Sequence, residues 1–298
     1  MTSANSAFDF APLLAPGLPP PAIKWNGFPK YNFVGGHNDA DHVPPDALVE
    51  TANDVLRREG RTLATYGLNS GPLGYLRLRE FLAQKLKRTA GIACHAGEIL
   101  ITSGSLQALD LVNGILLSRG DTVIVEQATY QGALTRLNRL GVNAIGIPLD
   151  GGGMRMDALA EALEDLRGKG IRPKYIYTIP TVQNPTGTIL NEARRRELLA
   201  LAEKYGVPIF EDDCYADLIW SGERPPALHA MSKPQRHPYR ARSRNRSRRL
   251  YRRRLGFASA HAGDQDRCRL RRARANGARR VLSEVFRYAC AGTDTRHA

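Results

Sequence analysis

Two stretches near the N-terminus alternate between apolar and polar positions with a helical repeat. PPDALVETANDVLRREG (residues 44–60) and GYLRLREFLAQKLKRTAG (residues 74–91) place apolar side chains three and four residues apart. This spacing predicts two amphipathic helices. The first 35 residues are instead rich in Pro and Gly, and they predict an extended arm with little regular structure.

From residue 98 the pattern changes, and short apolar runs alternate with helical segments. The runs do not alternate in polarity, which is typical of parallel strands covered by helices on both faces. Successive β-helix-β crossovers predict an α/β fold with three layers and a mainly parallel, doubly wound sheet, whose ligands bind at the carboxyl ends of the strands. The expected strands are 98–104, 121–127, 142–149, 174–180 and 207–213, and the expected helices are 105–120, 130–141, 156–170 and 191–206.

Charge divides the chain into two unequal parts. The net charge is +14, yet residues 232–298 contain 20 of the 43 Lys and Arg residues and only 4 of the 29 Asp and Glu residues. This basic tail therefore carries +16, and the rest of the chain carries −2. Arg clusters bind phosphate backbones, so one hypothesis is a nucleic-acid-binding protein with a basic arm. The tail lacks the interleaved aromatics of a dedicated module, so any binding should be non-specific and sensitive to salt.

Apolar runs and cysteine spacing bear on the cellular compartment and on metal binding. No apolar run approaches the ~20 residues that a membrane span needs, and the N-terminus is a poor signal peptide. Cys94, Cys214, Cys268 and Cys290 have neither metal-like nor disulfide-like spacing. We therefore expect a cytoplasmic protein with no membrane partner and no metal.

Small residues open the helix that follows the first expected strand. In TSGSLQALDL, free backbone N–H groups and the hydroxyl of Ser105 point to one place, as in a phosphate-binding helix N-terminus. Ser and Gly also simply cap helices, so this signal alone leaves both interpretations open. Tyr130 follows the second strand at the same edge of the sheet, where packing alone could explain it.

Two later strand ends carry more specific residues. Asn184, in TVQNPTGTIL, is held between a strand and a turn by the following Pro and presents a rigid amide. Asp212 and Tyr215, in IFEDDCYADL, end the next strand. A carboxylate in a crevice is costly without a partner, and a protonated ring nitrogen would be such a partner.

Together with YNFVGGHND and YGLNSGPLGY, these motifs resemble the class I/II aminotransferases, which use pyridoxal 5′-phosphate and have fold type I. The branch that the sequence resembles acts on 2-aminoadipate, kynurenine, aromatic or branched-chain amino acids. The resemblance runs from about Tyr31 to about Met231. It implies an arm and partial small domain at 1–60, an incomplete cofactor-binding large domain at 61–231, and a disordered, non-native tail at 232–298.

The resemblance also implies roles for single residues. Ser105 and the amide of Leu106 would hold the cofactor phosphate, although relatives often carry Gln at the second position. Tyr130 would stack on the pyridine ring, Asn184 and Tyr215 would bind its phenolic oxygen, and Asp212 would pair with its nitrogen. Tyr66 would reach the site of a partner subunit, which implies a homodimer. Gly36 would contact the substrate. An amino acid and a 2-oxo acid would be the substrates.

The family's chemistry needs a further residue, the Schiff-base lysine, which this chain lacks. In relatives it follows the Asp by about 30 to 35 residues. Residues 240–298 contain no Lys, and Lys233 lies too close to Asp212 to take its place. We therefore expect no catalytic residue in the chain, and loss of activity.

The genetic code suggests that a shifted reading frame of the same gene encodes the lysine. Codons for Ala241 to Tyr251, read one base out of frame, allow G-S-F-S-K-P-I-A-P-A-L, which contains the family's lysine motif. From Asp266, a shifted frame allows T-D-A-G-S-G-A-L-E-Q-M-V, which resembles the family's continuation. The hypothesis is that the basic tail is a frameshifted translation and that the C-terminal small domain, with its substrate-carboxylate Arg, is missing. Another enzyme of this fold, such as a C–S lyase, shares the ring-binding residues and stays open.

Overall fold

The structure, a computed structural model, describes residues 9–14, 24, 26–27, 30–31, 40–65, 67–219 and 222–232. The chain separates into two compact units, Met1–Tyr66 and Gly67–Ala298. Gly36, Tyr66, Lys233 and the basic tail beyond Ser232 lie outside the described residues, as do the predictions made for them.

The described part of the first unit contains one α-helix. α1 spans Pro45–Glu59 and confirms the first predicted amphipathic helix. Its Pro lies at the first helical position, where the missing N–H has no partner to lose. The other elements described in this unit are the short 3-10 turns η1 (Ala11–Leu13), η2 (Ala40–His42) and η3 (Gly60–Thr65).

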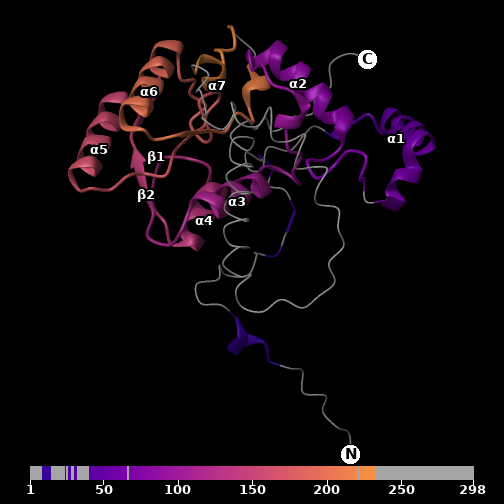
Figure 1. Cartoon of the computed structure of the whole chain (residues 1–298), viewed down its shortest axis with the longest axis horizontal. Helices are drawn as coiled ribbons and strands as arrows, with labels where there is room; N and C mark the ends of the chain where they lie inside the picture. The colour runs from indigo at the N-terminus through magenta and orange to yellow at the C-terminus, as the bar shows by residue number, and fades with distance from the viewer. Residues whose placement is uncertain are drawn as a thin grey trace, which may run out of the picture. The chain divides into compact units, whose positions relative to one another are not determined.

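The second unit contains the α/β domain (Figure 1). Its long helices are α2 (Leu76–Ala90), α3 (Ser105–Leu116), α4 (Gln131–Leu140), α5 (Met156–Gly168) and α6 (Glu192–Tyr205). Its strands are β1 (Thr122–Glu126), β2 (Asn143–Ile147), β3 (Leu149–Asp150), β4 (Gly153–Met154), β5 (Ile176–Thr178) and β6 (Ile209–Glu211). The other elements described in this unit are the short turns η4 (Ala96–Glu98) and η5 (Ala216–Leu218) and helix α7 (Leu228–Met231).

The main sheet is parallel and doubly wound, as predicted. Its order is β2-β1-β5-β6, so the chain first moves outward from β1 to β2 and then returns to the other side of β1. Ligands bind at such a switch point, beyond the carboxyl ends of the strands. Here the switch point lies between β1 and β5.

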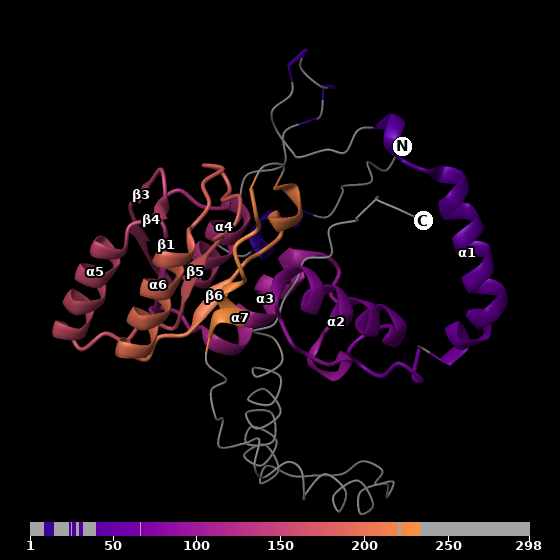
Figure 2. The same cartoon turned by 90° about the horizontal axis from the view of Figure 1, so that it is seen from above.

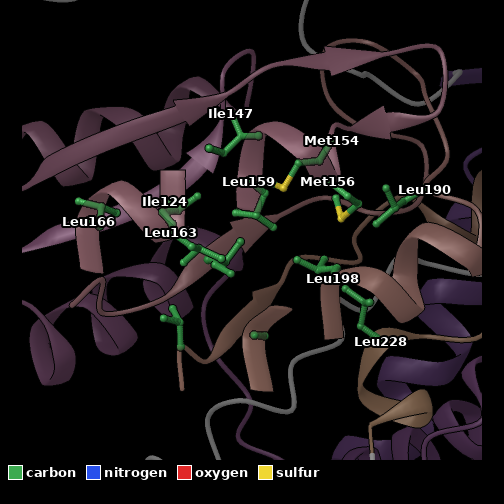
Figure 3. Packing of buried hydrophobic residues seen from close by; sticks show 13 residues of the cluster. Ile124, Ile147, Met154, Met156, Leu159, Leu163, Leu166, Leu190, Leu198 and Leu228 are labelled. Carbon is green, nitrogen blue, oxygen red and sulfur yellow. The ribbon is translucent and has the colours of Figure 1, made fainter. Parts of the chain in front are cut away.

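Helices cover both faces of this sheet. On one face, α3 and α4 pack through Val112 and Leu137 onto a cluster that includes Val123, Tyr177 and Phe210. On the other face, α5 and α6 pack against the sheet and lie side by side in both views (Figure 2). The side chains between this face and α5 and α6 form a second apolar cluster, which is shown in Figure 3. Ile124 and Leu163 are among its fully buried members. The three-layer prediction is therefore confirmed.

Two local predictions were wrong, and one element was missed. Residues 99–102 form no strand, and the N–H of Ile101 donates to the carbonyl of Leu73, in a turn, at 2.8 Å. α3 ends at Leu116 and not at Gly120, because the chain leaves helical geometry at Leu117. The β3–β4 hairpin was not anticipated, since two-residue strands carry no periodic signal.

The exposure of β2 also differs from expectation. All five residues of β1 are buried, whereas β2 is buried only at Ile147. β2 stands at the end of the strand order, so one of its edges has no neighbouring strand in the described sheet. Among the described residues, no helix is long and apolar enough to cross a lipid bilayer.

Candidate functional site

Asp212 stands at the carboxyl end of β6, next to β5. Its backbone N–H donates to the carbonyl of Thr178 at 2.9 Å, which continues the parallel pairing by one residue. Its side-chain Oδ2 accepts a hydrogen bond of 2.7 Å from the Tyr177 hydroxyl. Only 9% of the residue is exposed, so this carboxyl group is both buried and fixed in direction.

The protonation of Asp212 reflects its burial. Loss of solvent raises the pKa of its carboxyl, and hydrogen bonds from Tyr177 and Cys214 lower that pKa only in part. A buried carboxylate with a raised pKa is stabilised by a cation placed beside it. Asp212 is therefore suited to bind a positively charged group.

Asn184 and Tyr215 meet beside this carboxyl group. Nδ2 of Asn184 donates to the hydroxyl oxygen of Tyr215 over 3.3 Å, and the bond from Asn184 to Pro185 is cis. Burial raises the pKa of Tyr215, and the charges of Cys214 and Asp212 raise it further. An amide, a phenol and a carboxyl group thus lie close together, where they could bind the polar atoms of one ring-shaped ligand.

A buried hydrogen-bond network holds the turn that carries Asn184. Gln183 donates from Nε2 to Glu126 Oε2 at 2.9 Å and to the carbonyl of Ala128 at 2.7 Å. Oε1 of Glu126 accepts from the hydroxyl of Thr178 at 2.6 Å. Oε1 of Gln183 accepts from the N–H of Thr186 at 2.8 Å, inside the turn. This network ties the ends of β1 and β5 together at the switch point.

The other side of the same turn is held by a buried guanidinium. Arg195, with no exposed surface, donates to the carbonyls of Leu190 at 2.7 Å and Pro180 at 2.9 Å, and to the hydroxyl of Thr181 at 2.8 Å. Burial lowers its pKa, and Glu211, 3.9 Å away, opposes that shift. The turn is therefore fixed from both sides.

Tyr130 precedes α4 and packs against the α3–α4 face of the core. Its ring lies over Gly132, where an added Cβ would stand 2.5 Å from Cζ and 2.6 Å from the hydroxyl oxygen of Tyr130. Such distances are far inside van der Waals contact, so this ring position requires a glycine at 132. Tyr130 lies close enough to Tyr215 to affect its pKa.

Ser105 and Leu106 form the first turn of α3. The helix is preceded by Gly104 at φ 79°, a conformation that favours glycine. Ser105 is half-buried and Leu106 is 36% exposed. Nε of Arg136, on the neighbouring α4, donates to the carbonyl of Leu106 at 3.3 Å. The free N–H groups of this turn can bind an anion.

The structure thus brings Asn184, Asp212, Tyr215 and Tyr130 into one neighbourhood and places Ser105 and Leu106 on the adjacent helix α3. Sequence reasoning missed Glu126, Tyr177 and Gln183. Glu126 is a carboxylate ending an otherwise apolar strand, and Tyr177 shares a strand face with Tyr175. These signals were present in the sequence, but the hydrogen-bond partners of these residues come from other strands.

Comparison with known proteins is consistent with this arrangement. The family described as "Aminotransferase class I and II" matches residues 30–292, most of the chain. The chain belongs to this family. This is a family of pyridoxal phosphate-dependent aminotransferases, and the chain falls in its aromatic, aminoadipate and kynurenine aminotransferase branch.

Three curated relatives illustrate the range. Aromatic-amino-acid aminotransferase 1 of Thermococcus litoralis is 36% identical over 208 residues, which cover 70% of this chain and 49% of the relative. The 2-aminoadipate transaminase of Thermus thermophilus is 33% identical, with the same two coverages. The uncharacterized HTH-type transcriptional regulator YdfD of Bacillus subtilis is 43% identical over 173 residues, 58% of this chain and 34% of that protein.

Two solved structures of similar fold and sequence are also aminotransferases. The kynurenine aminotransferase of Pyrococcus horikoshii, in complex with PMP, has a TM-score of 0.62 at 36% identity, covering 68% of this chain and 49% of its own. The α-aminoadipate aminotransferase LysN of Thermus thermophilus, complexed with N-(5′-phosphopyridoxyl)-L-leucine, has a TM-score of 0.59 at 34% identity, covering 67% and 48%. The chain therefore spans about half the length of the aminotransferases named here.

Proposed function

We propose that this chain carries the cofactor-binding part of a pyridoxal phosphate-dependent aminotransferase, which moves an amino group from an amino acid to a 2-oxo acid. The observation that carries the proposal is the buried carboxyl group of Asp212 beside the Asn184–Tyr215 pair. Family membership supports it. The names of the relatives favour an aromatic amino acid, kynurenine or 2-aminoadipate as the amino donor.

The donor set fits the cofactor. When bound, pyridoxal phosphate supplies an aldehyde and a pyridine ring that accepts the electron pair released at the substrate carbon. Asp212 would balance the positive charge on the ring nitrogen, and Asn184 and Tyr215 would bind the ring oxygen. Ser105 and the Leu106 amide would hold the phosphate, and Tyr130 would stack on the ring. By family resemblance, Tyr66 would reach the site of the partner subunit in a homodimer, and Gly36 would contact the substrate.

We further propose that the chain as written is inactive, because its tail is a frameshifted form of the lysine region. Residues 234–298 contain no Lys. The missing amine would attach the cofactor and move the proton at the substrate carbon. Without it, the remaining residues could bind pyridoxal phosphate only noncovalently.

Two genes compared side by side test both proposals. One encodes the chain as written, and the other has its frame restored so that a Lys is encoded near positions 244–245. We expect borohydride to attach the cofactor to the restored protein alone. We also expect only that protein to convert an aromatic amino acid or 2-aminoadipate into its keto acid.

Three results would count against these proposals. A labelled peptide carrying Lys233, together with activity in the chain as written, would contradict the loss of function. Cleavage of cysteine conjugates by the restored protein, without amino transfer, would favour a C–S lyase. Absence of cofactor binding in both proteins would overturn the proposed function.

The charge of the basic tail supports a separate proposal, which is non-specific binding of nucleic acid. The tail's +16 should neutralise several phosphates, so affinity should fall steeply between low and physiological salt. Electrophoretic shifts with DNA of random sequence measure this, with a chain ending at Met231 as the control. Sequence preference that persists at high salt would instead indicate a dedicated DNA-binding protein.

A further inference from the structure

Two tyrosines on neighbouring same-face positions of the β5 region make different hydrogen bonds. The hydroxyl of Tyr175 donates to Asn113 Oδ1, and that of Tyr177 donates to Asp212 Oδ2, each at 2.7 Å. Each residue is 1% exposed, and both rings pack edge-to-face on Phe210, at 5.7 and 5.6 Å. The two side chains therefore share their environment and differ in the group that each hydroxyl holds.

We propose that Tyr177 is a positioning residue, which fixes the Asp212 carboxylate in direction and favours the ionised form that would receive the cationic ring nitrogen of the cofactor. The inference rests on the proposed function. The Tyr177 ring is held by Phe210 and by its place at the centre of β5, so its hydroxyl approaches Asp212 from a fixed point. The same β5–β6 pairing fixes the backbone of Asp212 through Thr178.

The protonation of both groups fits this role. Burial raises the pKa of the Tyr177 phenol, and the nearby Asp212 raises it further. The phenol therefore keeps its proton and acts as a donor toward Asp212. Such a donor stabilises the ionised form of its partner and lowers the pKa of Asp212.

The other groups facing Asp212 do not replace that donor with a positive charge. Cys214 lowers the pKa of Asp212 through a hydrogen bond, and Glu126 on β1 interacts with it as a like charge. Tyr215 lies close enough for the Asp212 charge to raise its pKa. Within the described part of the chain, no cationic side chain is among the groups that lower the pKa of Asp212. The positive partner that this carboxylate lacks would come from the ligand.

The test compares Tyr177→Phe with Tyr175→Phe in the full-length chain. Both changes remove one buried tyrosine hydroxyl beside Phe210, so Tyr175→Phe is the matched control for Tyr177→Phe. The first measurement follows the carboxyl infrared band of the ligand-free protein against pH, with Asp212→Asn assigning the band. The second measures noncovalent pyridoxal phosphate affinity by equilibrium dialysis between pH 5 and 8.

We expect Tyr177→Phe to raise the pH midpoint of the Asp212 carboxyl band by about one unit, as the loss of a hydrogen bond to a charged group implies. The pH below which cofactor affinity falls should rise with it, and affinity near pH 6 should drop about tenfold. Tyr175→Phe should move neither midpoint.

Each contrary result has its own meaning. An unmoved carboxyl band in Tyr177→Phe overturns the role of Tyr177, whatever the cofactor does. A moved band with unchanged cofactor affinity shows that the carboxylate does not serve the ring, and it also overturns the inference. Failure of the unmodified chain to bind pyridoxal phosphate, with the band moved as expected, overturns the proposed function and the ligand half of this inference together.

Discussion

The two ends of the candidate site are built differently. At the ring end, Asp212, Asn184 and Tyr215 follow strands of one parallel sheet, and buried hydrogen bonds through Glu126 and Arg195 fix the turn between them. At the phosphate end, Ser105 and Leu106 start a helix, and the segment before that helix bonds to a turn instead of a strand.

The two ends therefore differ in how firmly the described part of the chain positions their side chains. The ring end is positioned by strand pairing and by side chains with almost no exposed surface. The phosphate end is set by the start of one helix and is partly exposed. We therefore expect changes at the ring end to alter protein stability, and changes at the phosphate end to alter ligand affinity alone.

The largest effect is expected for Arg195→Met. Removing this guanidinium takes away the positive charge 3.9 Å from the buried Glu211 and the hydrogen bonds to the carbonyls of Leu190 and Pro180, which should lower the free energy of unfolding by about 3 to 5 kcal/mol. Urea titration measures the loss. The neighbouring Arg196→Met is the matched control, because that side chain is 69% exposed and should cost little. Equal effects would show that the ring end is not fixed by this residue.

The second effect concerns pH. Burial, with the Asp213 charge, raises the pKa of Glu211 to about 7 from 4.5. An acid with a raised pKa in the folded state contributes stability below its unfolded pKa, and that stability is lost as pH rises through the folded pKa. The free energy of unfolding should therefore fall between about pH 4.5 and 7, by about 1 to 3 kcal/mol.

Glu211→Gln isolates this contribution. The amide should remove most of the slope measured by urea titration at several pH values, because it does not titrate. The buried Glu126, Asp212 and Asp213 have raised pKa values as well, so a smaller slope of the same sign should remain. A slope unchanged by Glu211→Gln would contradict the assignment to this residue.

A smaller effect is expected at the phosphate end. Ser105→Ala removes one proposed hydrogen bond to the cofactor phosphate, worth about 1 kcal/mol, or roughly fivefold in affinity. Protein stability should not change, because the hydroxyl is not needed by the core. Equilibrium dialysis against pyridoxal phosphate measures the affinity, and Ser118→Ala, at an exposed position, provides the control. A large loss of stability would remove the distinction between the two ends.

The smallest effect links the two ends through Tyr130. In Gly132→Ala the new methyl group must displace the tip of the Tyr130 ring. Because only the end of a flexible side chain moves, we expect little change in stability and a two- to threefold weaker affinity, equivalent to about 0.5 kcal/mol. In a Tyr130→Ala background the same change should have no effect on affinity. An equal effect in both backgrounds would show that Gly132 acts through the helix instead.

The contrast between the two ends also explains what the sequence could predict. The parallel strands β1, β5 and β6 were predicted because buried apolar runs have a local signal, and Asn184 and Asp212 were predicted because they follow those runs. Residues 99–102 have the same apolar composition, yet they form no strand, because a strand requires a partner that composition does not reveal. Tyr177 and Gln183 were missed for a related reason, since their partners are remote in the chain.

The strand order has a consequence for how the chain folds. β1 and β2 are close in sequence and can pair early, whereas Ile124 of β1 pairs with Ile176 of β5 only after the intervening hairpin and helix have been made. Closing so long a loop before its contacts form is slow. During synthesis the edge of β1 that later pairs with β5 stays unpaired, and the Glu126 carboxylate stays hydrated until Thr178 and Gln183 have been added to the chain. We therefore expect the pairing of β1 with β5 to be the rate-limiting step of folding. Most of the domain should then have left the ribosome before the candidate site forms.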